Sequence, residues 1–200
     1  INNGIDLNKF KYSKEKRNEI RKELNIPEDT ILLGHVGRFS KQKNHKFLLK
    51  IYEEYVKSNP KSKLILIGKG KLETKIKKMV NKNGLREKIK FLGIRQDVNA
   101  IYSALDYFIF PSLYEGLSVS MIEAQVSGLS IFASDTIDHS TDISGNIKWL
   151  SIKHNSPKKW SEEILKTNKE RKIKNVNVKE YDIKNIARKM YNLYLNLGDK

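Results

Sequence analysis

The chain has 200 residues, 38% hydrophobic and 31% charged, and its 39 Lys and Arg against 23 Asp and Glu give a net charge of +16. This is an ordinary composition for a globular protein with one good core. The absence of cysteine excludes disulfides and thiolate metal sites, and no apolar run approaches the roughly 18 residues that a membrane-spanning helix needs.

Short apolar runs alternate along the chain with stretches in which apolar residues recur every three or four positions. The runs predict strands at residues 30–36, 63–67, 88–93, 107–110, 129–133 and 147–150. The periodic stretches predict helices at about residues 14–25, 45–59, 72–83, 98–105, 119–128, 157–165 and 183–197, with a loop at 166–179. This alternation predicts an α/β fold, a Rossmann-like three-layer sandwich with a parallel sheet, whose ligands bind at the carboxyl ends of the strands.

Residues 111–124 form the most informative stretch, Pro-Ser-Leu-Tyr-Glu-Gly-Leu-Ser-Val-Ser-Met-Ile-Glu-Ala. Ser118 is the expected N-cap of a helix, and the free N–H groups of a helix start can hold a phosphate. Glu115 on the turn and Glu123 about one turn into the helix are expected to face the same crevice. Carboxylates accept hydrogen bonds from sugar hydroxyls but repel phosphates, so acids beside an anion site suggest a ligand with both groups, such as a nucleotide sugar.

The pattern P-S-x-x-E-G-L-S-x-x-x-x-E-A, with Glu115 and Glu123 in an E-x7-E arrangement, resembles the retaining family-4 (group 1) glycosyltransferases of the GT-B fold. The resemblance implies that this chain is the C-terminal, donor-binding half of such an enzyme. It also implies that Glu115 contacts the hexose hydroxyls of the donor and that Glu123 contacts the ribose. The backbone N–H groups of Gly116, Leu117 and Ser118 would then meet the phosphates.

Arg38 and Lys43 follow the first strong strand and match the basic pair that holds the donor diphosphate in the resembled family. Fixed cations favour the transition state because the departing diphosphate gains charge as the glycosidic bond breaks. Glu115, Arg38 and Lys43 are therefore the predicted catalytic residues. Gly68 and Gly93 are expected to line the same cleft, and NAD binding is disfavoured because the glycine turn lacks the third glycine of a dinucleotide fingerprint.

The resemblance also predicts the domain organisation. Residues 1–12 are expected to be a remnant of an interdomain linker, and residues 13–180 the domain that binds the nucleotide sugar. Residues 181–200 are expected to form a helix that packs toward a missing N-terminal domain, without which the chain is expected to be inactive. Asn2 and Ser130 stand where the family pattern usually has proline.

The implied activity is the transfer of a hexose, with retention, from a nucleotide-diphosphate sugar to a glycan or lipid-linked acceptor in bacterial surface polysaccharide biosynthesis. UDP is the expected nucleotide. No cofactor or metal is expected, since the four histidines show no metal-ligand spacing. The expected location is the cytoplasm, with a peripheral contact at the inner face of the cell membrane.

The residues leave three alternatives open. A nucleotide-sugar epimerase would share the fold and the donor site. A non-catalytic polyanion-binding module would explain the net charge, but nucleic acid is disfavoured because the basic residues are spread along the chain without the aromatic motif of an RNA-binding sheet. A glycoside hydrolase would use Glu115 and Glu123 as acid and base, and would leave the basic pair without a purpose.

Overall fold

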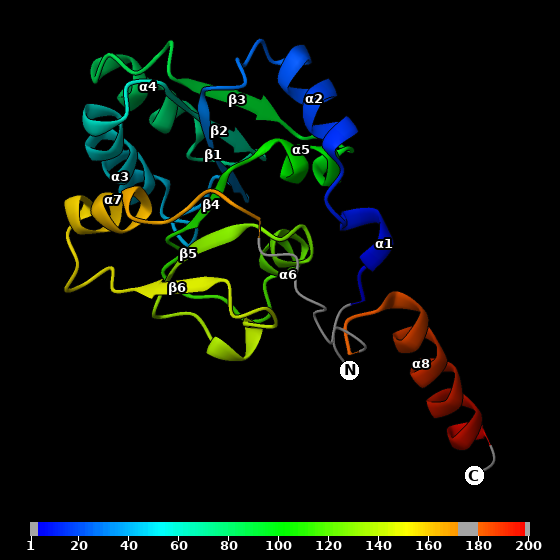
Figure 1. Cartoon of the computed structure of the whole chain (residues 1–200). Coiled ribbons are helices and arrows are strands. Elements are labelled where there is room, and N and C mark those ends of the chain that lie inside the picture. Colours follow the sequence, from blue (N-terminus) through cyan, green and yellow to red (C-terminus); the bar gives the residue numbers. More distant parts are fainter. Residues whose placement is uncertain (1–3, 172–179, 199–200) are drawn as a thin grey trace.

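The computed structural model describes residues 4–171 and 180–198, and its centre is a six-stranded sheet (Figure 1). The strand order is β3-β2-β1-β4-β5-β6, and every neighbouring pair is parallel. The strands are β1 (Ile31–Val36), β2 (Ser62–Ile67), β3 (Ile89–Gly93), β4 (Tyr107–Phe110), β5 (Ser130–Ser134) and β6 (Ile147–Leu150). The predicted parallel α/β sheet is therefore confirmed.

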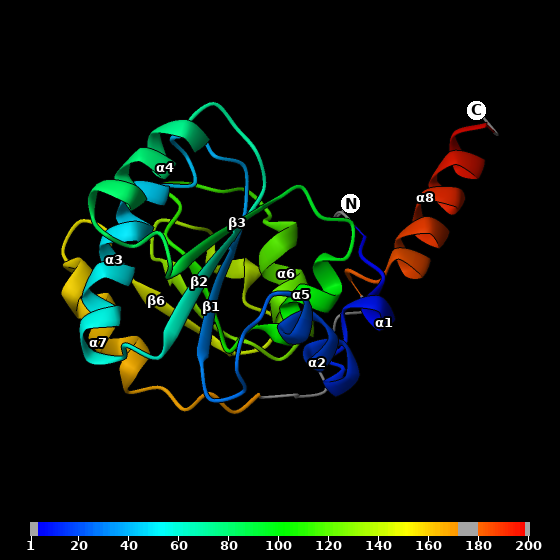
Figure 2. The same ribbon diagram turned by 90° about the horizontal axis from the view of Figure 1, so that it is seen from above.

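Helices cover both faces of this sheet. They are α1 (Leu7–Phe10), α2 (Lys14–Glu23), α3 (His45–Ser58), α4 (Glu73–Lys82), α5 (Val98–Ala104), α6 (Val119–Val126), α7 (Pro157–Leu165) and α8 (Ile183–Gly198). Figure 2 shows α3, α4 and α7 on one side of the strands and α2, α5 and α6 on the other. These are the three layers of the predicted sandwich.

Two apolar clusters fill the spaces between the layers, because successive side chains of a strand point to opposite faces. Leu32 of β1 belongs to the cluster under α2, α5 and α6, while its neighbour Leu33 belongs to the cluster under α3, α4 and α7. Their exposed fractions are 0% and 1%. A strand buried on both faces needs apolar residues at every position, which is why these strands appear in the sequence as continuous apolar runs.

The strand order places a topological switch between β1 and β4. From β1 the chain moves outward to β2 and β3, then returns to β4 beside β1 and continues to β5 and β6. The helices that follow β1 and β4, α3 and α6, consequently cover opposite faces of the sheet (Figure 2). The loops leaving these two strands diverge at the carboxyl edge, and such a point is where open α/β sheets bind their ligands.

The segment before α1 is joined to the start of α8. The Ile5 N–H donates to the Tyr181 carbonyl at 2.8 Å, and the Ile183 N–H donates to the Ile5 carbonyl at 3.0 Å. From there α8 extends away from the sheet (Figure 1), and its Tyr191 and Tyr194 are 64% and 66% exposed. The helix expected at 183–197 is confirmed, while its packing against another domain stays a prediction. No helix in the described part of the chain is long and apolar enough to cross a bilayer.

Two short elements lie where the sequence predicts none. Helix α1 falls within the expected linker 1–12, and the 3-10 turn His139–Thr141 lies between β5 and β6. Both begin at an aspartate whose side chain accepts hydrogen bonds from backbone N–H groups. Asp6 Oδ1 accepts two, at 3.1 and 3.2 Å, and Asp138 Oδ1 accepts one at 2.9 Å. Neither is long enough to show apolar periodicity. Part of the loop expected at 166–179 lies outside the described residues.

Candidate functional site

The loops that leave β1 and β4 are hydrogen-bonded to each other across the switch point. The Leu113 N–H donates to the Gln42 carbonyl at 2.8 Å, and the Gln42 amide donates to the Tyr114 carbonyl at 3.0 Å. The Asn44 amide donates to the Pro111 carbonyl at 3.2 Å. These contacts hold residues 38–44, which we call the basic loop, beside the loop that carries Glu115.

Glycines support the basic loop from the side of β2 and β3. Gly68 has a φ of +130°, and a Cβ there would lie 2.3 Å from the Gly37 carbonyl oxygen. At Gly70 a Cβ would lie 2.5 Å from the Phe39 carbonyl oxygen. The Gly68 N–H donates to the Gly93 carbonyl at 2.7 Å. The two predicted glycines, Gly68 and Gly93, therefore lie together, and Gly68 permits a close approach that any side chain would block.

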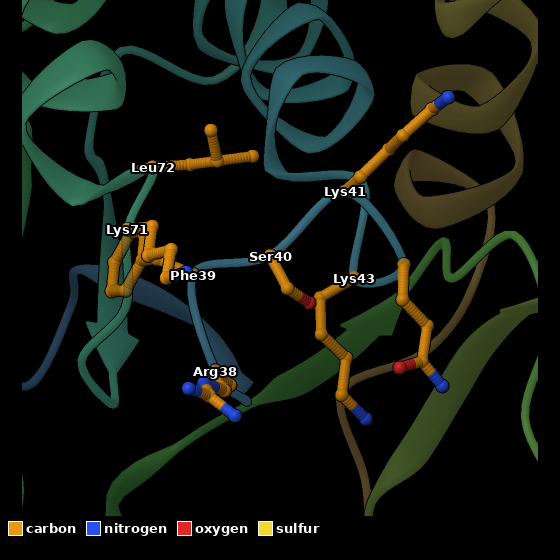
Figure 3. A pocket seen from close by; sticks show the side chains of 8 residues that line it. Arg38, Phe39, Ser40, Lys41, Lys43, Lys71 and Leu72 are labelled. Atoms are coloured by element: carbon orange, nitrogen blue, oxygen red, sulfur yellow. The ribbon is translucent and has the colours of Figure 1, made fainter.

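A cavity of about 350 Å³ opens beside the basic loop and is lined by residues 38–43, Lys71 and Leu72. Its lining includes four cations and no carboxylate. In Figure 3, Arg38 and Lys43 extend to the same side of the loop, whereas Lys41 extends away from them. A concave surface with several cations and no acid attracts anions such as phosphates.

Lys43 forms an ion pair with Glu115. Its Nζ lies 2.8 Å from Glu115 Oε1, and the two side chains are only 14% and 9% exposed. The same ammonium lies 4.5 Å from the centroid of the Phe110 ring. Among the described residues, Arg38 has no ion-pair partner. The fold thus brings all three predicted catalytic residues to the mouth of the switch point.

The start of α6 lies directly after this loop. Ser118 occupies the N-cap position as expected, but its hydroxyl makes no cap hydrogen bond and lies 3.1 Å from the Ser120 hydroxyl. The first N–H groups of the helix therefore have no side-chain cap and can meet an anion. At Gly116 an added Cβ would meet no atom of the described part of the chain within 4 Å, so packing there does not require glycine. The Leu117 side chain is partly buried against the cluster that contains Ile5, Ile122 and Tyr181.

Glu123 lies on α6 and faces α5. Its Oε2 accepts a hydrogen bond from the Tyr102 hydroxyl at 3.1 Å. Burial raises the pKa of Glu123 to about 7, against smaller lowering effects from the Tyr102 hydroxyl and Lys9. Glu123 is thus hydrogen-bonded to Tyr102, while Glu115 forms its ion pair with Lys43. That the two glutamates share one crevice stays a prediction.

Two buried histidines beneath the basic loop had no role in the sequence analysis. His35 on β1 and His45 at the start of α3 are 0% and 2% exposed, with ring centroids 4.8 Å apart. The His45 ring also stacks on Phe39 at 4.1 Å. His35 Nδ1 donates to the Ile109 carbonyl at 2.8 Å, while His35 Nε2 and both His45 nitrogens have no hydrogen-bond partner within residues 4–171 and 180–198. A histidine inside an otherwise apolar strand is the signal that could have revealed this packing.

Burial is the main cause of lowered pKa values in this histidine pair. It lowers the pKa of His45 to about 4 and holds the pKa of His35 well below the ordinary value, with a further lowering from the charge of Lys43. The imidazoles are therefore neutral at pH 7. A neutral pair beneath the loop leaves the positive charge of the site on its arginine and lysines.

The profile of the family described as glycosyl transferases, group 1, matches residues 16–189. The chain is 36% identical over 140 residues to EpsF of Bacillus subtilis (strain 168), covering 70% of this chain and 36% of EpsF. It is 31% identical over 138 residues to the UDP-Gal:alpha-D-GlcNAc-diphosphoundecaprenol alpha-1,3-galactosyltransferase of Escherichia coli, covering 68% and 36%. The chain spans about a third of the length of these two curated relatives.

Solved structures share the fold. HepE of Anabaena, in complex with UDP and glucose, superposes with a TM-score of 0.81 at 20% identity, covering 97% of this chain and 55% of HepE. WaaG, a glycosyltransferase involved in lipopolysaccharide biosynthesis, superposes with a TM-score of 0.71 at 21% identity, covering 81% and 45%.

Proposed function

Because this chain belongs to the group 1 glycosyl transferases, we propose that the cleft at its topological switch point binds a nucleotide-diphosphate sugar. The chain has the fold of the C-terminal half of a GT-B enzyme. The observation that carries the proposal is the cation-lined basic loop beside Glu115, because a diphosphate needs cations and a sugar needs acceptors for its hydroxyls. UDP is the first candidate nucleotide, since the Escherichia coli relative is named for UDP-Gal and HepE holds UDP.

In the proposed complex, each predicted residue has one role. Arg38 and Lys43 bind the diphosphate, and the uncapped N–H groups at the start of α6 contact the phosphate oxygens. Glu115 accepts hydrogen bonds from the hexose hydroxyls, and Glu123 accepts them from the ribose. The cations contribute most when the diphosphate departs, because its charge is then greatest.

The proposed reaction is hexosyl transfer with retention. The bond between the anomeric carbon and the phosphate oxygen breaks, and a bond to the acceptor hydroxyl forms on the same face of the sugar. The acceptor's proton passes to the departing phosphate, so no protein nucleophile is required. The relative from Escherichia coli is named for a diphosphoundecaprenol-linked acceptor. A glycan or lipid-linked acceptor in polysaccharide biosynthesis, reached from the cytoplasm at the inner face of the membrane, is therefore the proposed partner.

The apolar face of α8 suggests how the rest of such an enzyme is attached. Met190, Tyr191, Leu193 and Tyr194 are all exposed on this helix, which extends from the body of the domain. We assign this face to contact with an N-terminal domain, as the resemblance implies, and the chain alone is then expected to bind donor without transferring sugar. Exposed apolar helix faces of this kind mark interaction surfaces.

Calorimetric titration of the 200-residue chain with UDP, GDP and ADP tests the donor site. UDP is expected to bind, and Lys43→Ala is expected to weaken binding about tenfold or more because a largely buried cation is lost from the phosphate. Lys50→Ala is the control, since it removes the same charge from an exposed side chain on α3 that does not line the cavity.

Equal losses of affinity in the two lysine variants would mean that net charge alone attracts the nucleotide. That result, or a folded chain that binds none of the three diphosphates, would contradict the proposed donor site.

Nucleotide affinity is expected to depend on pH through Glu123. Its pKa is about 7 in the free chain, and the ionised carboxylate accepts hydrogen bonds from two ribose hydroxyls more strongly than the protonated acid does. UDP binding should therefore tighten about tenfold between pH 6 and pH 8, with a proton released near pH 7. Glu123→Gln should flatten this part of the profile. If the UDP affinities of wild type and Glu123→Gln change in parallel with pH, the proposed contact between Glu123 and the ribose is contradicted.

A further inference from the structure

Lys43 and Glu115, two residues that the proposed function assigns to different parts of the donor, are already paired with each other. The 2.8 Å contact places the ammonium that should meet phosphate against the carboxylate that should meet sugar. Both side chains are largely withdrawn from water, at 14% and 9% exposure. The ligand must therefore replace a contact that the free protein has made within itself.

The neighbouring residues fix this pair in place. Gln42, directly before Lys43, is hydrogen-bonded to Leu113 and Tyr114, directly before Glu115. The two loops thus lie side by side next to the ion pair. On the Lys43 side the ammonium also lies against the Phe110 ring.

We propose that Glu115 is a specificity-determining residue that makes the site prefer the complete sugar donor over the free nucleoside diphosphate left after transfer. The proposal rests on the proposed function, because it takes the nucleotide-sugar site as given. It adds that Glu115 opposes the product as well as contacting the sugar.

The two ligands differ in what they offer to the Lys43–Glu115 ion pair. A free nucleoside diphosphate draws Lys43 toward its phosphates and leaves a buried carboxylate without its cation and close to new negative charge, which costs free energy. A nucleotide sugar makes the same exchange but brings hydroxyl groups that donate to the carboxylate. Only the sugar-bearing ligand therefore replaces the contact that the Glu115 carboxylate loses when Lys43 turns to the phosphates. The same residue should therefore favour donor binding and speed release of the product.

The test is calorimetric titration of the wild-type 200-residue chain and Glu115→Gln with UDP and with UDP-glucose, UDP-galactose and UDP-N-acetylglucosamine. Glutamine keeps the size and the acceptor oxygen of the side chain but removes its charge. Glu115→Gln is expected to bind UDP about tenfold tighter or more, since its Lys43 is free and no buried anion remains. The wild-type preference for the best UDP-sugar over UDP should fall toward unity.

Glu19→Gln is the matched control, because it removes one negative charge from an exposed position on α2. Its UDP affinity should stay at the wild-type value. Near-ultraviolet circular dichroism and a thermal melt establish that each variant is folded. In a ¹⁵N lysine spectrum without ligand, the Lys43 ammonium signal should shift in Glu115→Gln, because the variant lacks the charge partner of Lys43.

The outcomes separate this inference from the proposed function. UDP binding to Glu115→Gln that is no tighter than to wild type, or an unchanged sugar preference, overturns the inference and leaves the donor site standing. If wild type binds no nucleotide but Glu115→Gln binds UDP, the inference is supported and the wild-type donor proposal needs revision. If neither protein binds any of the four ligands, both proposals fall.

Discussion

Replacing Asp106 with alanine is expected to lower the free energy of unfolding by about 3–5 kcal/mol, because it removes the counter-ion of the buried Arg21 and of the partly buried Arg17. Asp106 Oδ1 lies 2.9 Å from Arg17, and Oδ2 lies 2.7 Å from Arg21. The same Oδ2 accepts the Leu32 N–H at 2.7 Å, so the carboxylate also anchors β1. Arg21 is 2% exposed, and burial lowers its pKa against the opposing effect of Asp106.

Urea unfolding at pH 7 measures this loss, and thermal unfolding should show a fall of roughly 10 °C in a chain of this size. Asp29→Ala is the control, because Asp29 pairs with Lys61 at 2.8 Å but their side chains are 60% and 76% exposed. It should change the unfolding curve little. Asp106→Asn should fall between, since an amide still accepts one N–H bond. A similar small effect of all three substitutions would show that the arginines find other partners.

Acid is expected to destabilise the fold through His45. In an unfolded chain its pKa is near 6.5, whereas in the folded chain burial lowers it to about 4. Above pH 6.5 the imidazole is neutral in both states and contributes nothing to the pH dependence. Below that pH the unfolded chain binds the proton first, so stability falls until about pH 4. The total loss from this group is about 3 kcal/mol.

The measurement is urea unfolding of wild type and His45→Phe at pH 7.5, 5.5 and 4.5. Phenylalanine keeps a ring against Phe39 and His35 but cannot bind a proton, so the variant should lose less stability in acid. His154→Asn, an exposed position, should follow the wild-type curve. Glu123, whose raised pKa acts in the opposite sense, is common to these proteins and cancels in the comparison. Coincident pH dependences of His45→Phe and wild type would contradict the assignment.

The sequence was sufficient for the order of the elements, because strands buried on both faces are apolar throughout and their ends are set by glycine and proline. Predicted and observed boundaries differ by one or two residues, as at the helix predicted to reach residue 25, which ends at Glu23. Helix α1 was missed because an aspartate side chain starts it and it has no periodicity. Local rules therefore predict elements well when burial shapes the pattern over several turns or a full strand.

The contacts within the site could not be predicted from the sequence, because they join residues far apart in the chain. The pattern predicted Lys43 and Glu115 as site residues, but the ion pair between them depends on two loops that meet only in the folded sheet. The bond from Tyr102 to Glu123 links two helices, and the raised pKa of Glu123 follows from burial that the sequence does not display. The histidine pair likewise depends on β1 and α3 lying side by side.

The hydrogen bonds between the loops after β1 and β4 fix the conformation of the basic loop during folding, before any ligand binds. A loop of this kind, if left untethered, would lose that freedom on meeting its ligand, at an entropic cost of about 1–2 kcal/mol for each backbone residue fixed. Here Gln42 and Asn44 are tethered as the chain folds. The ligand therefore meets a surface of fixed shape, and the part of its affinity that ordering would have removed is retained.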